Sequence, residues 1–103
     1  MNCETELNTL RLAMQRAGLP AVRRTIDALH LQTMDTDLSM RIWDELLVMA
    51  VDYGHPDVAT FALEQGKIHS EAYRRASTLA KAAQDEVLQR AIERRGTYRR
   101  AQP

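Results

Sequence analysis

Two histidine–carboxylate pairs have the residue types that metal binding or acid–base catalysis would need. His55 and Asp57 form one pair, and His69 and Glu71 form the other. Side chains two residues apart on a helix point in different directions, so either pair would need a loop or a helix cap to share a metal ion. We therefore interpret both pairs as polar surface and expect neither a metal ion nor another cofactor.

The sequence also lacks the usual signals of a nucleophilic or nucleotide-dependent site. The single cysteine, Cys3, lies near the N-terminus. No Gly-x-Ser-x-Gly turn, glycine-rich phosphate loop or His-Glu-x-x-His pair is present. A nucleophile needs an adjacent base and a group that orients the base, and no motif supplies them. We therefore predict that the protein is not an enzyme.

The C-terminal segment is rich in arginine and is the candidate partner-binding surface. Its candidate residues are Arg90, Arg94, Arg95, Tyr98, Arg99 and Arg100. Arginines neutralise phosphates and a tyrosine can stack on bases, so one hypothesis is a nucleic-acid-associated regulator. The net charge of zero argues against a dedicated nucleic-acid-binding domain. The other hypotheses are an acidic protein partner and a tail that only increases solubility.

The charges are unevenly distributed along the chain. From Asp27 to Glu64 there are eight acidic residues and one basic residue, Arg41, whereas from Lys67 onward there are nine basic and four acidic residues. An acidic middle and a basic end can attract each other within a molecule or between copies, or attract a partner. Self-association into a homo-oligomer therefore stays open.

The elements that position these residues are predicted to be helical. The chain has 103 residues, of which 45% are hydrophobic and 5% aromatic, and no segment alternates apolar and polar residues over the length of a strand. We predict an all-α fold in which residues 1–96 form a single domain and residues 97–103 a flexible basic tail.

Glycine and proline mark the predicted turns. Gly18 and Gly54 each end a helix, and Pro20 and Pro56 each suit the first turn of the next one. Gly66 ends the helix that begins at Pro56. Because the connections at Gly18 and Gly54 are short, each pair of helices should form an antiparallel hairpin. The segment VLQRAIERRG also echoes VATFALEQG in the second of these pairs.

Apolar spacing predicts which helix faces lie inward. The predicted central helix, capped by Thr36 or Asp37, is apolar nearly all round and includes Leu38, Ile42, Trp43, Leu46, Leu47, Ala50, Val51 and Tyr53. Trp43 is interpreted as a core anchor. Two later apolar stripes differ in direction: Ala72, Ala76, Leu79 and Ala83 in one, and Val87, Leu88, Ala91 and Ile92 in the other. The second stripe reaches the core only if the helix breaks near residues 84–86, with Asp85 as a cap.

Residues 45–66, ELLVMAVDYGHPDVATFALEQG, resemble an ankyrin repeat. The residues that fall in that register are Leu47, Ala50, Gly54, His55, Asp57, Val58, Leu63, Glu64 and Gly66. STLAKAA resembles the opening of a following repeat, and NTLRLAM that of an earlier one. The Thr-Pro-Leu-His signature is degenerate, and residues 66–77 should be helical where the family has a β-hairpin. The resemblance implies stacked helix pairs in which His55 bridges backbone groups of neighbouring hairpins.

These patterns together predict five or six short helices in stacked antiparallel hairpins, either helical-repeat-like or a small bundle. The expected function is protein binding, as an adaptor, chaperone or regulatory subunit, in a groove between the helices at residues 20–31 and 56–65. No apolar run approaches the ~20 residues of a membrane span. The first ten residues lack the basic and apolar regions of a secretory signal. We therefore expect a cytoplasmic protein without a membrane partner.

Overall fold

Every regular element that the structure describes is an α-helix. The computed structural model describes residues 4–31 and 35–101, with the side chains of residues 96–101 left out. The helices are α1 (Glu4–Leu29), α2 (Thr36–Asp52), α3 (Pro56–Gln65), α4 (Ser70–Ala82) and α5 (Glu86–Ala101). No strand occurs in the described ranges, and the predicted all-α class is confirmed.

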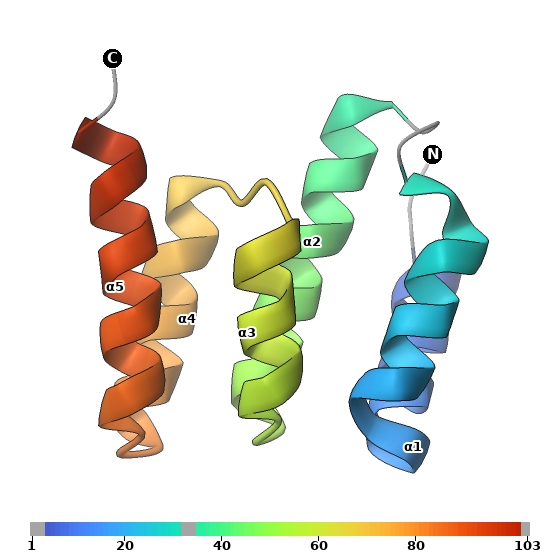
Figure 1. Ribbon diagram of the computed structural model, residues 1–103, viewed down its shortest axis with the longest axis horizontal. Helices are drawn as coiled ribbons and strands as arrows, with labels where there is room; N and C mark the ends of the chain where they lie inside the picture. Colours follow the sequence, from blue (N-terminus) through green and yellow to red (C-terminus); the bar gives the residue numbers. More distant parts are fainter. Residues whose placement is uncertain (1–3, 32–34, 102–103) are drawn as a thin grey trace.

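The helices pair into three antiparallel hairpins that stand side by side (Figure 1). Helix α1 folds back on itself, α2 pairs with α3, and α4 pairs with α5. The second helix of each hairpin, meaning the C-terminal half of α1, then α3 and α5, forms the near layer in Figure 1. The first helices form the far layer, in which α2 packs against α4. This is the predicted arrangement of stacked hairpins.

The first hairpin turns at Gly18, as predicted. Its backbone (φ 70°, ψ −152°) is non-helical and divides α1 into two halves. A side chain at a positive φ with this ψ would be strained, and glycine avoids that cost. Pro20 follows in the first turn of the second half, where a backbone N–H has no helical partner and its loss costs little.

The second and third hairpins close with the same turn. After α2 and after α4, a backbone N–H donates to the carbonyl five residues earlier, at 2.8 Å and 3.0 Å respectively. This is a Schellman motif, which requires one left-handed residue. That residue is Gly54 (φ 76°) in the second hairpin and Gln84 (φ 59°) in the third. The third turn therefore forms without the Gly-x-Pro sequence of the other two.

Aspartate side chains cap the N-termini of two helices, α2 and α5. The predicted break between α4 and α5 is confirmed, and Asp85 Oδ1 accepts a hydrogen bond from the Leu88 N–H at 3.0 Å. The expectation of Thr36 or Asp37 as the cap of α2 is wrong. Asp35 occupies this position, with its carboxylate accepting from the Asp37 N–H at 2.9 Å, because α2 begins at Thr36.

One hydrophobic core runs through all three hairpins. Its fully buried large side chains are Leu10, Met14, Val22, Ile42, Leu46, Leu47, Val58 and Ile92. Trp43 is 9% exposed, which confirms it as a core residue. Three predicted core positions are wrong: Val87 is 82% exposed, Tyr53 is 44% exposed and Ala83 lies exposed in a turn. Helix α5 begins at Glu86, so Leu88 rather than Val87 is its first inward residue.

Helix α5 continues beyond the domain boundary expected at residue 96. Its helical backbone reaches Ala101, and its axis lies at the left edge of Figure 1, with the C-terminus at the top. Residues 97–101 therefore belong to the helix. The flexibility of the tail stays a prediction.

Candidate functional site

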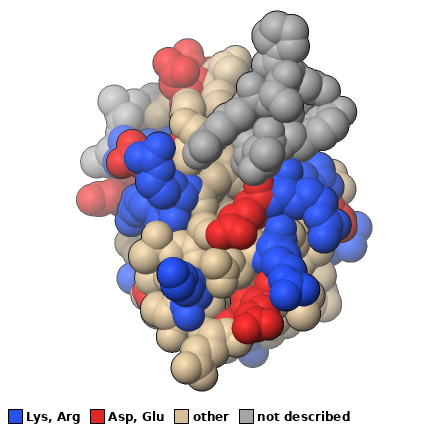
Figure 2. All heavy atoms as spheres, turned by 90° about the vertical axis from the view of Figure 1, so that its left-hand side faces the viewer, with Lys and Arg blue, Asp and Glu red and all other residues tan. Residues whose placement is uncertain are grey.

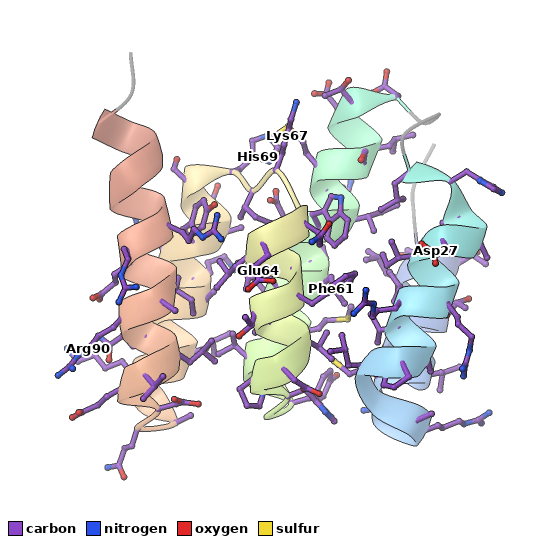
Figure 3. All side chains as sticks on the ribbon, in the orientation of Figure 1. Asp27, Phe61, Glu64, Lys67, His69 and Arg90 are labelled. Carbon is purple, nitrogen blue, oxygen red and sulfur yellow. The ribbon has the colours of Figure 1, made fainter. Side chains whose placement is uncertain are left out.

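The predicted partner-binding arginines lie at one end of the stack. Arg90, Arg94 and Arg95 are exposed on α5, and Arg90 projects away from the neighbouring helices in Figure 3. The side chains of Tyr98, Arg99 and Arg100 lie outside the described residues. A surface made by all six predicted residues is therefore not established.

The end face formed by α4 and α5 carries both signs of charge. Figure 2 shows acidic side chains between the lysine and arginine side chains of this face. Between the two helices, Glu93 of α5 accepts hydrogen bonds from the Ser77 hydroxyl of α4 and from the Gln89 amide, each at 3.1 Å. This mixture reduces the positive potential that a nucleic-acid backbone would need.

His55 contributes to the turn through its backbone. Its N–H donates to Ala50 at 2.8 Å and its carbonyl accepts from the Ala59 N–H at 3.1 Å. The ring makes no capping hydrogen bond. Asp57, its sequence partner, accepts from the Val58 N–H at 2.9 Å. A bridge from the His55 ring to a neighbouring hairpin is not found among the hydrogen bonds of the described residues.

His69 pairs with a residue that sequence spacing did not suggest. Its Nδ1 lies 2.6 Å from Asp44 Oδ2, and its backbone N–H donates to Asp44 Oδ1 at 2.9 Å. The Asp44 side chain is 17% exposed and that of His69 is 51% exposed. Both contacts tie the segment between α3 and α4 to α2. A carboxylate that orients a histidine is also part of many catalytic sites, but no hydroxyl or thiol of the described residues hydrogen-bonds to this ring.

A shallow recess of about 210 Å³ surrounds this pair. Its lining residues are Asp44, Glu45, His69, Glu71, Ala72 and Arg75. Across it, Arg75 lies 3.8 Å from Glu45, joining α4 to α2 in the far layer. No group of three or more histidine, cysteine or carboxylate side chains in the described part of the chain is placed to hold a metal ion. The polar contacts in this recess connect the second hairpin to the third.

A further candidate binding site is a cavity of about 460 Å³, which we call the Trp43 cavity. Its lining residues are Ile26, Asp27, Leu31, Thr36, Ser39, Met40, Trp43, Gln65 and Lys67. The volume lies within the range of ligand clefts in proteins. The apolar side chains come from α1, α2 and the residues after α1, whereas Asp27 and Lys67 place opposite charges on the rim.

The Trp43 indole is held by close packing on the side of α3. An added Cβ on Gly66 would lie 2.7 Å from two indole carbons, so the chain passes directly against the ring. Phe61 packs on Trp43 with ring centroids 5.7 Å apart, at an interplanar angle of 59°. The Arg23 guanidinium of α1 lies 5.6 Å from the centroid of Phe61. These contacts join the first and second hairpins beside the cavity.

The cavity lies where the end of α1, the first half of α2 and the end of α3 meet, and a groove along the helices at residues 20–31 and 56–65 stays a prediction. The C-terminal half of α1 and α3 face each other in the near layer, with Phe61 pointing from α3 toward α1 and Asp27 on α1 (Figure 3). The predicted pair of helices supplies Ile26, Asp27 and Gln65 to the lining. The contribution of α2 was missed, because the periodicity of a central helix does not show where its neighbours leave space.

Comparison of the chain with known protein families, with characterised proteins and with solved structures found no match. The geometry described above is therefore the basis for the function. Within the described residues, no helix has the length and apolar character that crossing a membrane would require.

Proposed function

We propose that the chain is a small protein-interaction module that works as an adaptor, chaperone or regulatory subunit and performs no catalytic step itself. Its partner binds along the groove between the C-terminal half of α1 and α3, and one side chain of the partner enters the Trp43 cavity. The hairpins provide an ankyrin-like scaffold for this surface.

The Trp43 cavity is the observation that carries the proposal. It has an apolar wall of Ile26, Leu31, Met40 and Trp43 and a polar rim, the composition that anchors a side chain at a protein interface. The Trp43 part of this wall is held in place, because Gly66 and Phe61 pack against the indole. A pre-ordered pocket lowers the entropy lost on binding.

The Asp44–His69 pair is interpreted as structural. Asp44 uses both carboxylate oxygens to hold His69 and its backbone N–H. Those contacts keep the third hairpin against the second, so they maintain the scaffold on which the groove depends.

The test is capture of partners from the native host by full-length protein with the cavity open or blocked. Ser39 lines the cavity from α2, and Ser39→Phe fills it with a side chain that a helix tolerates. Thr9→Phe is the matched control, because Thr9 is exposed on α1 and does not line the cavity. Both variants are first checked for wild-type helicity and melting.

The expected result is a set of proteins that wild type and Thr9→Phe retain and Ser39→Phe loses. Equal retention by all three proteins would refute the groove as the binding surface. Turnover of a co-purified small molecule, at a rate unaffected by Ser39→Phe, would contradict the non-catalytic role.

A further inference from the structure

The charges at the opening of the Trp43 cavity indicate which kind of partner it would bind. Among the described residues of the lining, Lys67 is the single basic one and Asp27 the single acidic one. Thr36, which also lines the cavity, lies between Asp35 and Asp37, and both of these carboxylates are exposed. One carboxylate and one ammonium group therefore line the cavity, and two more carboxylates lie on the exposed residues that flank Thr36.

The first turn of α2 does not reverse this balance. A helix N-terminus carries about half a positive charge, and here Asp35 already accepts the Asp37 N–H at 2.9 Å. Arg41 lies further along α2 and does not line the cavity. The second hairpin, residues 36–65, has six acidic residues and one basic residue, of which Asp44 and Glu45 line the other recess. The carboxylates nearest the opening favour a ligand with positive charge over an anionic one.

We infer that the Trp43 cavity binds a short segment of a partner protein that carries a bulky aliphatic side chain next to arginine or lysine. The aliphatic side chain packs on Ile26, Leu31 and Trp43 inside the cavity, and the basic side chains lie against Asp27 and the carboxylates at the start of α2. This inference rests on the proposed function and specifies the partner that the groove selects.

Trp43 allows a direct test, because it is the only tryptophan of the chain. The probes are three capped peptides without aromatic residues: Gly-Arg-Leu-Leu-Arg-Gly, Gly-Glu-Leu-Leu-Glu-Gly and Gly-Arg-Ser-Ser-Arg-Gly. Each is titrated into the full-length protein while the tryptophan emission is followed with excitation that spares tyrosine. A change in this emission that Ser39→Phe abolishes places the peptide at the cavity.

We expect the Arg-Leu-Leu-Arg peptide to bind more tightly than both others. An exposed ion pair contributes up to about fivefold in affinity, so the preference over the glutamate peptide should reach roughly five- to twentyfold at low salt. Raising the ionic strength should reduce the preference, since exposed charges are screened. Asp27→Asn should weaken binding of the basic peptide severalfold.

Asp52→Asn is the matched control for Asp27→Asn. It removes the same charge from an exposed position at the end of α2 and should leave binding unchanged. A preference for the glutamate peptide would overturn the inference, as would equal weakening by the two variants. Equal binding of the leucine and serine peptides would overturn the apolar part.

The peptide titration and the partner capture can each give a negative result while the other gives a positive one. If Ser39→Phe abolishes partner capture but no basic peptide changes the emission, the inference is wrong and the proposed function stands. If peptides bind but capture ignores Ser39→Phe, the proposed function is wrong. Salt-sensitive self-association that Ser39→Phe abolishes would assign the cavity to a second copy of the chain and would overturn the inference of a separate partner.

Discussion

Substitution of Gly66 by alanine tests the close packing that forms the Trp43 cavity. The added methyl group would lie 2.7 Å from the indole Cγ and Cδ2 and 2.9 Å from the Ala62 carbonyl oxygen. These ring carbons are next to the Trp43 backbone and cannot swing away as the end of a flexible side chain can. Overpacking of this kind typically costs about 1–3 kcal/mol.

A smaller effect opposes the clash. The backbone at Gly66 (φ −94°, ψ 153°) is extended and suits alanine. Alanine also restricts the unfolded chain, which stabilises the folded protein by about 0.4–1 kcal/mol. The net loss should be roughly 1–2 kcal/mol. For a domain of this size each kcal/mol lowers Tm by about 4–8 °C. Urea and thermal unfolding followed by circular dichroism would measure both values.

A double-mutant cycle with Trp43→Ala identifies the cause. Without the indole, the cost of Gly66→Ala should fall by at least about 1 kcal/mol, and the part that comes from the Ala62 carbonyl oxygen should remain. Gly54→Ala is the control, because its cost comes from a positive φ and no atom lies within 4 Å of the added Cβ. Its cost should be the same in both backgrounds. If Gly66→Ala is equally destabilising with and without Trp43, the packing argument is refuted.

Three further outcomes follow from contacts elsewhere in the stack. Gln84→Gly should stabilise the protein by about 0.5–1 kcal/mol in chemical unfolding, because Gln84 holds a left-handed backbone (φ 59°) that glycine adopts without strain; a loss of stability would contradict this. Asp44→Ala should cost about 1–3 kcal/mol and more than His69→Ala, because Asp44 also accepts the His69 backbone N–H, which the second variant keeps; equal losses would argue against that contact. On a heparin column, the full chain should elute at low salt, since acidic side chains interrupt the basic end face; retention to high salt that deletion of residues 94–103 abolishes would favour the nucleic-acid hypothesis.

Local signals in the sequence were sufficient for the architecture. Glycine followed by proline marked the turns at Gly18 and Gly54, and the change in direction of the apolar stripes located the break before α5. Both depend on neighbouring residues, which helical geometry relates directly. The echo between VLQRAIERRG and VATFALEQG was one residue out of register, since Leu88, not Val87, takes the buried place of Val58. A valine in the first turn of a helix carries no sign of which way it points.

The candidate site was less accessible to sequence reasoning. Asp44 and His69 are 25 residues apart, and their contact depends on how two hairpins dock. The groove helices were predicted, but the cavity between them arises from what α1, α2 and the end of α3 leave unfilled. The reason for glycine at position 66 is also tertiary. Its conformation is ordinary, and the constraint is the Trp43 ring from another helix.

The side-by-side order of the hairpins has a consequence for how the molecule opens. The second hairpin packs on both of its neighbours, whereas the principal contacts of the first and third are with the second alone. Amide hydrogens of the outer hairpins should therefore exchange with solvent earlier than those of α2 and α3. Breathing at the first hairpin would widen the Trp43 cavity while its indole stays in place. A bulky segment could then enter by displacing the first hairpin. The free energy needed would be that of local opening, which is smaller than the free energy of global unfolding.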